Sequence, residues 1–453
     1  MKNKTLLLTT LSLAGGGAPF TASGQGTPPN IIVILADDQG FSDLGCYGAT
    51  GFTTPHIDSL AAHGMRFTNF YDPTPISSPS RAGFLTGCYP PRVGIDRVLG
   101  RTSRIGISQD VFTLPEMLKE EGYSTLAIGK WHLGHLDGAL PTDHGFEEFF
   151  GVPYSNDMLP LPLMHDKSIL FNIEDQSYLT TLYTEKCVDY IKKTDKSKPF
   201  FIYLAQTMPH VPLAVSDKFK GRSERGLYGD VIMELDWSVG QIVDALRTEG
   251  IDDNTLVVIT SDNGPWRVYG DHAGSAFPFR DGKFSRFEGG NHQFCIMYWK
   301  GHIREASVNS SICSLMDLYP TFGELAGAAP EKTAHLDGQS ILPSVLGTGP
   351  DRIDHEFIFY LLRDHALGVR QGRWKLMLEQ NGKELIYGGR NGERGKEIQT
   401  TFPEALYDLE NDPSETTDQS RKHPGIVKRL KKAIRDFDED IAARSIPATD
   451  YSL

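Results

Sequence analysis

The stretch Asn30-Ile31-Ile32-Val33-Ile34-Leu35-Ala36-Asp37-Asp38 decides the fold of this 453-residue chain. Its continuous apolar, β-prone run is typical of a strand that is buried on both faces of a parallel sheet. A second run, Thr255-Leu256-Val257-Val258-Ile259-Thr260, has the same pattern and leads into Ser261-Asp262-Asn263-Gly264. Both predicted strands therefore carry acidic or amide side chains at their carboxyl ends, the edge where ligands bind in open α/β sheets.

Further runs repeat this plan along the chain. Residues 124–129 and 200–205 are also apolar and β-prone, and amphipathic segments at Val111 to Glu121 and Gly229 to Glu249 indicate helices. Alternating strands and helices favour an α/β fold with a large mixed, mostly parallel sheet sandwiched by helices.

The domain organisation follows from changes in composition. A Gly-Thr-Gly-Pro linker begins at Gly347, after which the predicted strands become shorter and end in a helical run from Pro424 to Arg444. We expect a catalytic domain over residues 28–345 and a smaller C-terminal α+β subdomain over 346–453, with a small antiparallel sheet and a helix.

The N-terminal residues 1–24 have the pattern of a secretory signal peptide. Lys2 and Lys4 precede an apolar stretch from Leu6 to Ala14, and small and polar residues follow. This stretch is far shorter than the ~20 residues that span a bilayer, so we expect no membrane span. The pattern predicts an exported protein, periplasmic or secreted.

Composition narrows the class of partner. The chain is 39% hydrophobic, which supports a large core, and 45 basic against 58 acidic residues give a net charge of -13. An acidic surface argues against nucleic acid as a partner, and an anionic substrate would need a locally basic pocket. The five cysteines show no paired spacing, so we assign no disulfides.

A potential nucleophile lies in Ser77-Ser78-Pro79-Ser80-Arg81-Ala82-Gly83-Phe84-Leu85-Thr86-Gly87. Pro79 suits a first helical turn, Ser77 or Ser78 could cap that turn and leave backbone N–H groups free for an anion, and Arg81 adds a fixed positive charge. The alternative is a capped helix in a Ser/Pro-rich surface loop.

The two strand-end pairs suggest a metal. Asp37, Asp38, Asp262 and Asn263 offer oxygen donors without cysteine or histidine, a set that suits Ca²⁺ or Mg²⁺ better than zinc. Adjacent strand residues point to opposite faces, so Asp37 and Asp38 can share a ligand only if the chain has left extended geometry there. The alternative is two separate strand-end turns.

Basic residues are expected at the same edge of the sheet. Lys130 and His132 follow the strand at 124–129, His210 follows the strand at 200–205, and Lys283 lies in a charged, glycine-rich loop after Asp262. Each could instead be a solvated or structural side chain, since a lone Lys or His at a strand end is often neither catalytic nor ligand-binding.

Together these motifs resemble the type I, formylglycine-dependent sulfatases of the alkaline-phosphatase-like superfamily. The signature of that family, Cys or Ser, any residue, Pro, Ser, Arg, is matched by residues 77–81. Other blocks match in the family's order: Thr54–Asp58, Lys130 with His132, Pro153–Asp157, Asp262–Asn263, Lys283 with Glu288–Gly290, Asp317–Thr321 and Leu406–Pro413. The resemblance implies that Ca²⁺ is bound by Asp37, Asp38, Ser77, Asp262 and Asn263.

The resemblance also implies a mechanism. A maturase oxidises residue 77 to formylglycine, and Arg81 and Lys130 hold its hydrate, which attacks sulfur to give a covalent sulfate hemiacetal. Lys130, Ser155, His210 and Lys283 contact the sulfate, His210 protonates the leaving group, and His132 removes the proton that lets sulfate depart. The expected substrate is a sulfated carbohydrate such as a glycosaminoglycan or an algal galactan of the carrageenan type.

Position 77 departs from most of the family, which has cysteine there. Three accounts are open: a maturase that oxidises serine, a natural cysteine replaced by serine, or a catalytically silent relative that binds sulfated glycans. A phosphate mono- or diesterase of the same superfamily is a further alternative, although those enzymes usually hold two zinc ions with several histidines. Candidate sugar-binding residues, which could equally be surface charges, are Arg97, Arg101, Arg104, Trp266, Arg267 and Arg363.

Overall fold

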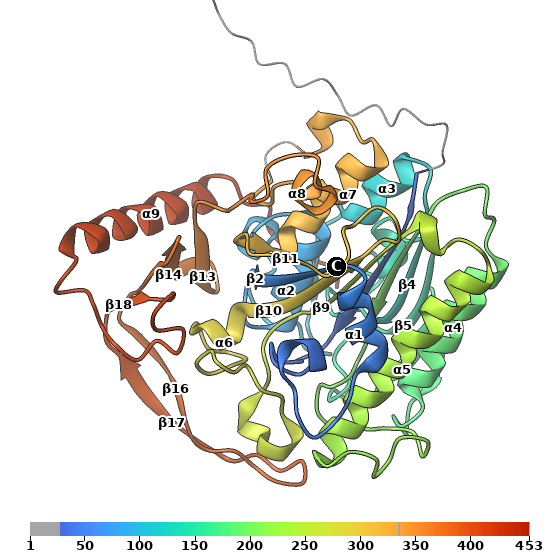
Figure 1. Cartoon of the computed structure of the whole chain (residues 1–453), viewed down its shortest axis with the longest axis horizontal. Helices are drawn as coiled ribbons and strands as arrows, with labels where there is room; N and C mark the ends of the chain where they lie inside the picture. The colour runs from blue at the N-terminus through green and yellow to red at the C-terminus, as the bar shows by residue number, and fades with distance from the viewer. Residues whose placement is uncertain (1–27, 334–335, 453) are drawn as a thin grey trace, which may run out of the picture.

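An 11-stranded sheet forms the centre of the computed structural model, which describes residues 28–333 and 336–452 (Figure 1). Its strands are β1 (Asn30–Ala36), β2 (Met65–Tyr71), β4 (Ser124–Lys130), β5 (Glu148–Val152), β6 (Pro162–His165), β7 (Ser168–Asn172), β8 (Phe200–Ala205), β9 (Thr255–Ser261), β10 (His292–Tyr298), β11 (Ser307–Asn309) and β12 (Cys313–Ser314). Their order is β11-β2-β10-β9-β1-β8-β4-β5-β6-β7, with β12 paired to β2. The predicted signal peptide, residues 1–24, lies outside the described residues.

The middle of the sheet is parallel, as predicted. Strand β1 pairs in parallel with β9 and β8, and β4 pairs in parallel with β8 and β5. Antiparallel pairs occur toward the two edges, at β10 and at β6 and β7. The prediction of a large mixed, mostly parallel sheet is therefore confirmed, and the four sequence runs that predicted strands are β1, β4, β8 and β9.

Helices cover both faces of this sheet (Figure 1). They are α1 (Pro55–Ala62), α2 (Ser77–Thr86), α3 (Leu114–Glu120), α4 (Leu179–Lys193), α5 (Gly226–Thr248), α6 (Glu288–Asn291), α7 (Leu318–Ala326) and α8 (Leu342–Leu346). Val33 of β1 packs in one core with residues of α2, α3, α7 and α8, whereas Ile34 packs in a second core with α1, α4 and α5. Successive strand residues point to opposite faces, so burial on both sides explains why β1 is apolar throughout.

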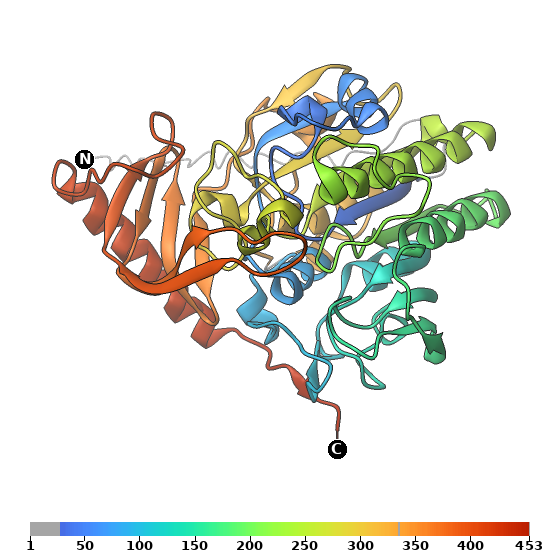
Figure 2. The same cartoon turned by 90° about the horizontal axis from the view of Figure 1, so that it is seen from below.

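A smaller C-terminal unit packs beside the large sheet, as Figure 2 shows. Its elements are β13 (Ile358–Leu362), β14 (His365–Gln371), β15 (Trp374–Met377), β18 (Ala405–Asp408), the hairpin strands β16 (Gln380–Tyr387) and β17 (Lys396–Phe402), and α9 (Pro424–Ala443). The four-stranded sheet β13-β14-β15-β18 is antiparallel. Phe437 of α9 stacks on Phe359 of β13 at 4.0 Å between ring centroids. The expected α+β subdomain is thus present, and its boundary at residue 346 stays a prediction.

Two features join the C-terminal unit to the rest of the chain. Buried Lys375 on β15 lies 3.0 Å from Glu288 of α6 and 2.8 Å from Glu415, and its ammonium donates to the carbonyl of Arg286. Near the end of the chain, β19 (Thr449–Asp450) pairs with β3 (Ile105–Gly106). The segment that carries Lys283 is therefore fixed from both sides, by the large sheet and by the C-terminal unit.

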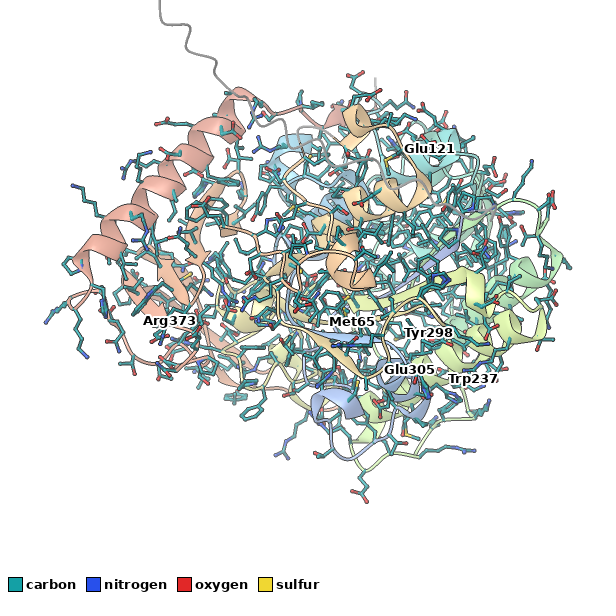
Figure 3. The ribbon with its side chains drawn as sticks, turned by 45° about the horizontal axis from the view of Figure 1, so that its top comes forward. Met65, Glu121, Trp237, Tyr298, Glu305 and Arg373 are labelled. Carbon is teal, nitrogen blue, oxygen red and sulfur yellow. The ribbon has the colours of Figure 1, made fainter. Side chains whose placement is uncertain are left out.

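Side chains fill the space between these layers. In Figure 3, Met65 marks the start of β2, Tyr298 marks the end of β10, and Arg373 marks the C-terminal unit. All five cysteines are free thiols, which agrees with the assignment of no disulfides. In the part of the chain that the structure describes, no helix has the length and apolar character needed to cross a bilayer.

Candidate active site

The carboxyl ends of β1 and β9 meet at one point. Asp38 has a φ of 65°, so the chain leaves extended geometry directly after β1. The Asp38 backbone N–H donates to Asp262 Oδ1 at 3.2 Å, and Asn263 Nδ2 donates to Asp38 Oδ1 at 2.7 Å. The pair Asp37-Asp38 therefore meets the pair Asp262-Asn263 across more than 220 positions of sequence, as predicted. The alternative of two separate turns is wrong.

Ser77 is the first residue of α2 and faces these carboxylates. Its hydroxyl lies 3.2 Å from Asp37 Oδ1 and 3.3 Å from Asn263 Oδ1. The prediction that Ser77 or Ser78 caps the helix is wrong: the N-cap is Ile76, and Ser78 Oγ instead accepts from the Leu99 N–H. Every residue of α2 is buried, so a surface loop is excluded, and the hydroxyls of Ser77 and Ser78 find their partners in distant segments.

Arg81 lies one turn along α2 and contacts the end of β9. Its Nη2 and Nε donate to Asp262 Oδ2 at 2.7 and 2.9 Å, and Nη1 donates to the Lys130 carbonyl and to the Tyr203 hydroxyl. Burial lowers the pKa of Arg81, but Asp262, Tyr203 and Asp37 together outweigh burial, and the net pKa is raised. Arg81 is thus a fixed cation that links the carboxyl end of β9 to helix α2.

Lys130 ends β4 and lies beside the Ser77 hydroxyl. Its Nζ is 2.5 Å from Asp37 Oδ2, 3.4 Å from Ser77 Oγ and 3.3 Å from Ser155 Oγ. Burial raises the pKa of Asp37, yet Lys130 and the other nearby cations outweigh it and hold that pKa below its usual range. Burial likewise lowers the pKa of Lys130, with Asp37 opposing that shift.

Lys283 and His210 lie next to Asp38, whereas Lys130 lies next to Asp37. Lys283 Nζ lies 2.8 Å from Asp38 Oδ1, and His210 Nε2 lies 3.7 Å from Asp38 Oδ2. His210 Nδ1 is 2.6 Å from the Val211 carbonyl, which can only accept, so Nδ1 carries the proton and Nε2 faces the site. The ring centroid of Trp266 lies 4.5 Å from Lys283 Nζ and 5.6 Å from the centroid of the His210 ring, so this indole packs against both residues.

His132 supplies a free ring nitrogen near the same cations. Its Nε2 is 3.0 Å from the Leu99 carbonyl and must donate, which leaves the lone pair on Nδ1. The Nδ1 atom is buried and has no hydrogen-bond partner among the described residues. Burial, together with Lys130 and Arg81, lowers the pKa of His132 well below its usual value. This nitrogen is therefore a neutral proton acceptor.

The donor set fits a hard divalent cation. Side-chain oxygens of Asp37 and Asn263 contact the Ser77 hydroxyl, and Asp38 and Asp262 join the same cluster through Asn263 Nδ2 and the Asp38 N–H. Ligand atoms of Asp37, Asp38 and His210 lie within 4.8 Å of one another. Three carboxylates are matched by three cations, Arg81, Lys130 and Lys283. A divalent cation would make this site net positive, the condition that an anionic substrate needs.

The predicted sugar-binding residues are spread more widely. Arg97 pairs with Asp96, and Arg104 pairs with Asp450, whereas Trp266 alone of the set contacts Lys283 and His210. The sequence does not predict two groups that orient site residues. The Tyr203 hydroxyl contacts Arg81, and the Leu99 carbonyl contacts His132. A tyrosine hydroxyl within the apolar run of β8 was the available signal for Tyr203, because a buried hydroxyl requires a partner.

Comparison with known proteins identifies the class. The family model described as Sulfatase matches residues 29–328, and the C-terminal region of aryl-sulfatase matches residues 353–449. The chain therefore belongs to the sulfatase family of the alkaline-phosphatase-like superfamily and is a sulfuric ester hydrolase.

Three relatives show how far the likeness extends. The chain is 39% identical over 396 residues to N-acetylgalactosamine-6-sulfatase of Canis lupus familiaris, covering 82% of this chain and 74% of that protein. It is 36% identical over 444 residues to arylsulfatase A of Homo sapiens, covering 90% and 87%. The crystal structure of Ps i-CgsB in complex with k-i-k-neocarrahexaose superimposes with a TM-score of 0.79 and 29% identity, covering 93% of this chain and 95% of that one.

Proposed function

We propose that this enzyme hydrolyses sulfate esters of a sulfated carbohydrate at Ser77. The observation that carries the proposal is the buried arrangement of three carboxylates and three cations around the Ser77 hydroxyl. Two of the relatives support the substrate class, since one is named for a sulfated amino sugar and the other was solved with a neocarrahexaose.

The site fits Ca²⁺ as the resident cation. Asp37, Asp38, Asp262, Asn263 and the oxygen of residue 77 would hold it, and oxygen-only ligation by carboxylates and an amide is the chemistry that Ca²⁺ prefers. A bound divalent cation would stabilise negative charge on the sulfate and favour the ionised form of an oxygen at residue 77.

Residues of this chain account for the remaining requirements of the reaction. Oxidation of residue 77 to formylglycine would supply an aldehyde whose hydrate offers two hydroxyl groups. Lys130, beside Ser77 Oγ, holds the attacking oxygen, and Lys283 meets the charge on the sulfate. In its doubly protonated form His210 carries a second proton on Nε2, which faces Asp38, and would donate that proton to the leaving sugar oxygen, while His132 Nδ1 is free to accept a proton from residue 77.

The state of residue 77 provides the decisive test. The peptide that contains residue 77 is isolated from protein purified from its natural host and weighed by mass spectrometry. Loss of two hydrogens relative to serine, with trapping by an aldehyde reagent, is the expected result. Sulfate release from a panel of sulfated oligosaccharides is then measured by ion chromatography.

Matched variants separate the open accounts of Ser77. Ser77→Ala should abolish sulfate release, whereas Ser80→Ala should retain it, because Ser80 Oγ is buried without a hydrogen-bond partner among the described residues. Ser77→Cys made together with a maturase should be active if serine replaced a natural cysteine. Binding of oligosaccharides with no sulfate release by that variant would instead identify a silent glycan-binding protein.

A further inference from the structure

A cavity of about 350 Å³ is lined by Lys283, which contacts Asp38, and by Trp266, which contacts Lys283. One wall is the loop from Asp281 to Phe287, and the opposite wall is the β16–β17 hairpin of the C-terminal unit. Figure 2 shows this hairpin, in orange-red, extending across the catalytic part of the molecule. A volume of this size lies in the range of small-ligand sites, and the cavity shares a wall with the catalytic centre.

Arg286 is a buried cation in this cavity without a matching carboxylate. It is 8% exposed, its Nε donates to Gln380 Oε1, and Nη2 donates to the Asn381 carbonyl at 3.4 Å. Among residues 28–333 and 336–452, no Asp or Glu lies within ion-pair distance of it. Burial lowers the pKa of this guanidinium to about 10, with only a small opposing effect of Asp281. Buried charges are normally paired, so the arrangement is suited to an anion that is supplied from outside.

The other cations of the cavity are already engaged, and the Asp281 carboxyl in the same lining has a pKa that burial raises, which favours its neutral form next to an anion. Lys283 pairs with Asp38, and at the rim Lys383 and Arg394 both contact Glu397, at 3.4 and 3.2 Å. Arg286 is therefore the cation of this lining with free capacity for a ligand anion.

Aromatic rings give the cavity a surface for a sugar ring. The ring of Trp266 is contacted by two cations, with Lys283 Nζ at 4.5 Å and Arg394 Cζ at 5.3 Å from its centroid. Phe284, in the same lining, is 47% exposed. Exposed aromatic side chains of this kind provide apolar contact area next to polar anchors.

We propose that this cavity is a second anion-binding subsite, in which Arg286 binds the sulfate or carboxylate of the sugar adjacent to the one that loses its sulfate. The inference rests on the proposed carbohydrate substrate, and it makes the C-terminal hairpin a determinant of specificity. The subsite favours glycans that carry an anionic group on neighbouring sugars over singly sulfated ones.

The test is direct binding of a heparin-derived tetrasaccharide, which carries anionic groups on successive sugars, by isothermal titration calorimetry. All proteins carry Ser77→Ala so that no turnover occurs. Arg286→Gln should weaken binding by about tenfold or more, as expected for the loss of a charge-assisted contact, and Arg286→Lys should recover part of it. Arg435→Gln, on the exposed surface of α9, is the matched control and should bind like the parent.

Inorganic sulfate serves as the second probe, because it is too small to occupy the catalytic pocket and the subsite at once. Arg286→Gln should weaken sulfate binding less than it weakens tetrasaccharide binding, because the cations of the catalytic pocket remain in place. Equal tetrasaccharide affinities for the parent and Arg286→Gln, or no binding to the parent at millimolar concentration, would overturn the proposal. If Arg286→Gln does not fold, Arg286→Lys replaces it and should weaken tetrasaccharide binding about threefold, because it keeps the charge and loses the planar guanidinium.

The two proposals fail in different ways. Tetrasaccharide binding that depends on Arg286, with no sulfate released from any oligosaccharide by the enzyme with Ser77 intact, would refute the proposed function and leave the subsite standing. Sulfate release with tetrasaccharide affinities unchanged by Arg286→Gln would refute the subsite alone.

Discussion

Lys375→Met removes a buried cation that holds two carboxylates at the junction between the C-terminal unit and the catalytic part. Lys375 Nζ lies 3.0 Å from Glu288 Oε1 and 2.8 Å from Glu415 Oε1. Methionine has a similar volume, so the change leaves little cavity and tests mainly charge. Both carboxylates would remain buried, with Arg370 at 4.0 Å from Glu288 as the nearest remaining guanidinium contact.

Removing one partner of a buried ion pair costs about 3–5 kcal/mol, because the other charge stays desolvated. We therefore expect the free energy of unfolding of Lys375→Met to fall by about that amount. Lys383→Met is the matched control: its ion pair with Glu397 is about half exposed on the lysine side, and such pairs contribute about 0–1 kcal/mol. Urea unfolding followed by circular dichroism measures both variants.

The double variant Lys375→Met/Glu415→Gln sharpens the test. Burial raises the pKa of Glu415 to about 7, against the lowering effect of Lys375, so loss of the lysine raises this pKa further and disfavours the charged form of Glu415. Neutralising it should restore at least half of the lost stability. A loss below about 1 kcal/mol for Lys375→Met, or no recovery in the double variant, would refute the reasoning.

Three further predictions concern the catalytic centre and its surroundings. Lys283→Ala should lower kcat/KM for sulfate release by about 10²–10³-fold, because a preorganised cation next to the reacting anion is lost; a loss no larger than that of Lys432→Ala, an exposed control on α9, would contradict its role. Removal of Ca²⁺ with a chelator should abolish activity and lower the Tm, since bound ligand at a hundred times its Kd stabilises by about 2.7 kcal/mol, and added CaCl₂ should restore both; an unchanged Tm and rate would exclude the metal. Burial raises the pKa of Asp43 to about 6 from its ordinary 3.8, against hydrogen bonds from Tyr228, Ser275 and Gly40. The folded state therefore binds this proton first, and its contribution to the free energy of unfolding falls as the pH rises from about 4 to about 6. Tyr228→Phe removes one of those hydrogen bonds and should extend the fall above pH 6 in thermal unfolding scans, so an unchanged pH profile would count against this assignment.

The sequence predicts the large sheet and the location of the site because both depend on local patterns. Continuous apolar runs identify β1 and β9, and the topology of a parallel sheet brings Asp37 and Asp262 to one edge. The capping role of Ser77 was predicted wrongly because the same hydroxyl finds better partners, Asp37 and Asn263, that lie 40 and 186 positions away.

Contacts of the C-terminal unit could not be predicted in this way. Lys375 meets Glu288 across 87 positions, and Arg286 meets Gln380 across 94. No periodicity or residue spacing in the sequence indicates either contact. Whether a lysine on a short antiparallel strand is exposed or buried depends on what packs against that strand. For the same reason, the sequence does not indicate that the β16–β17 hairpin lines the cavity beside Lys283.

Because Ser77 is buried in the folded protein, an enzyme can modify this residue only for a limited time during synthesis and folding. In the folded protein this residue is 2% exposed and is closed in by Asn263, which is synthesised 186 residues later. At about 5–20 residues per second, the ribosome leaves roughly 10–40 s between the appearance of the two residues. An enzyme that oxidises Ser77 must therefore reach it while the chain is still unfolded, and slower folding would increase the modified fraction.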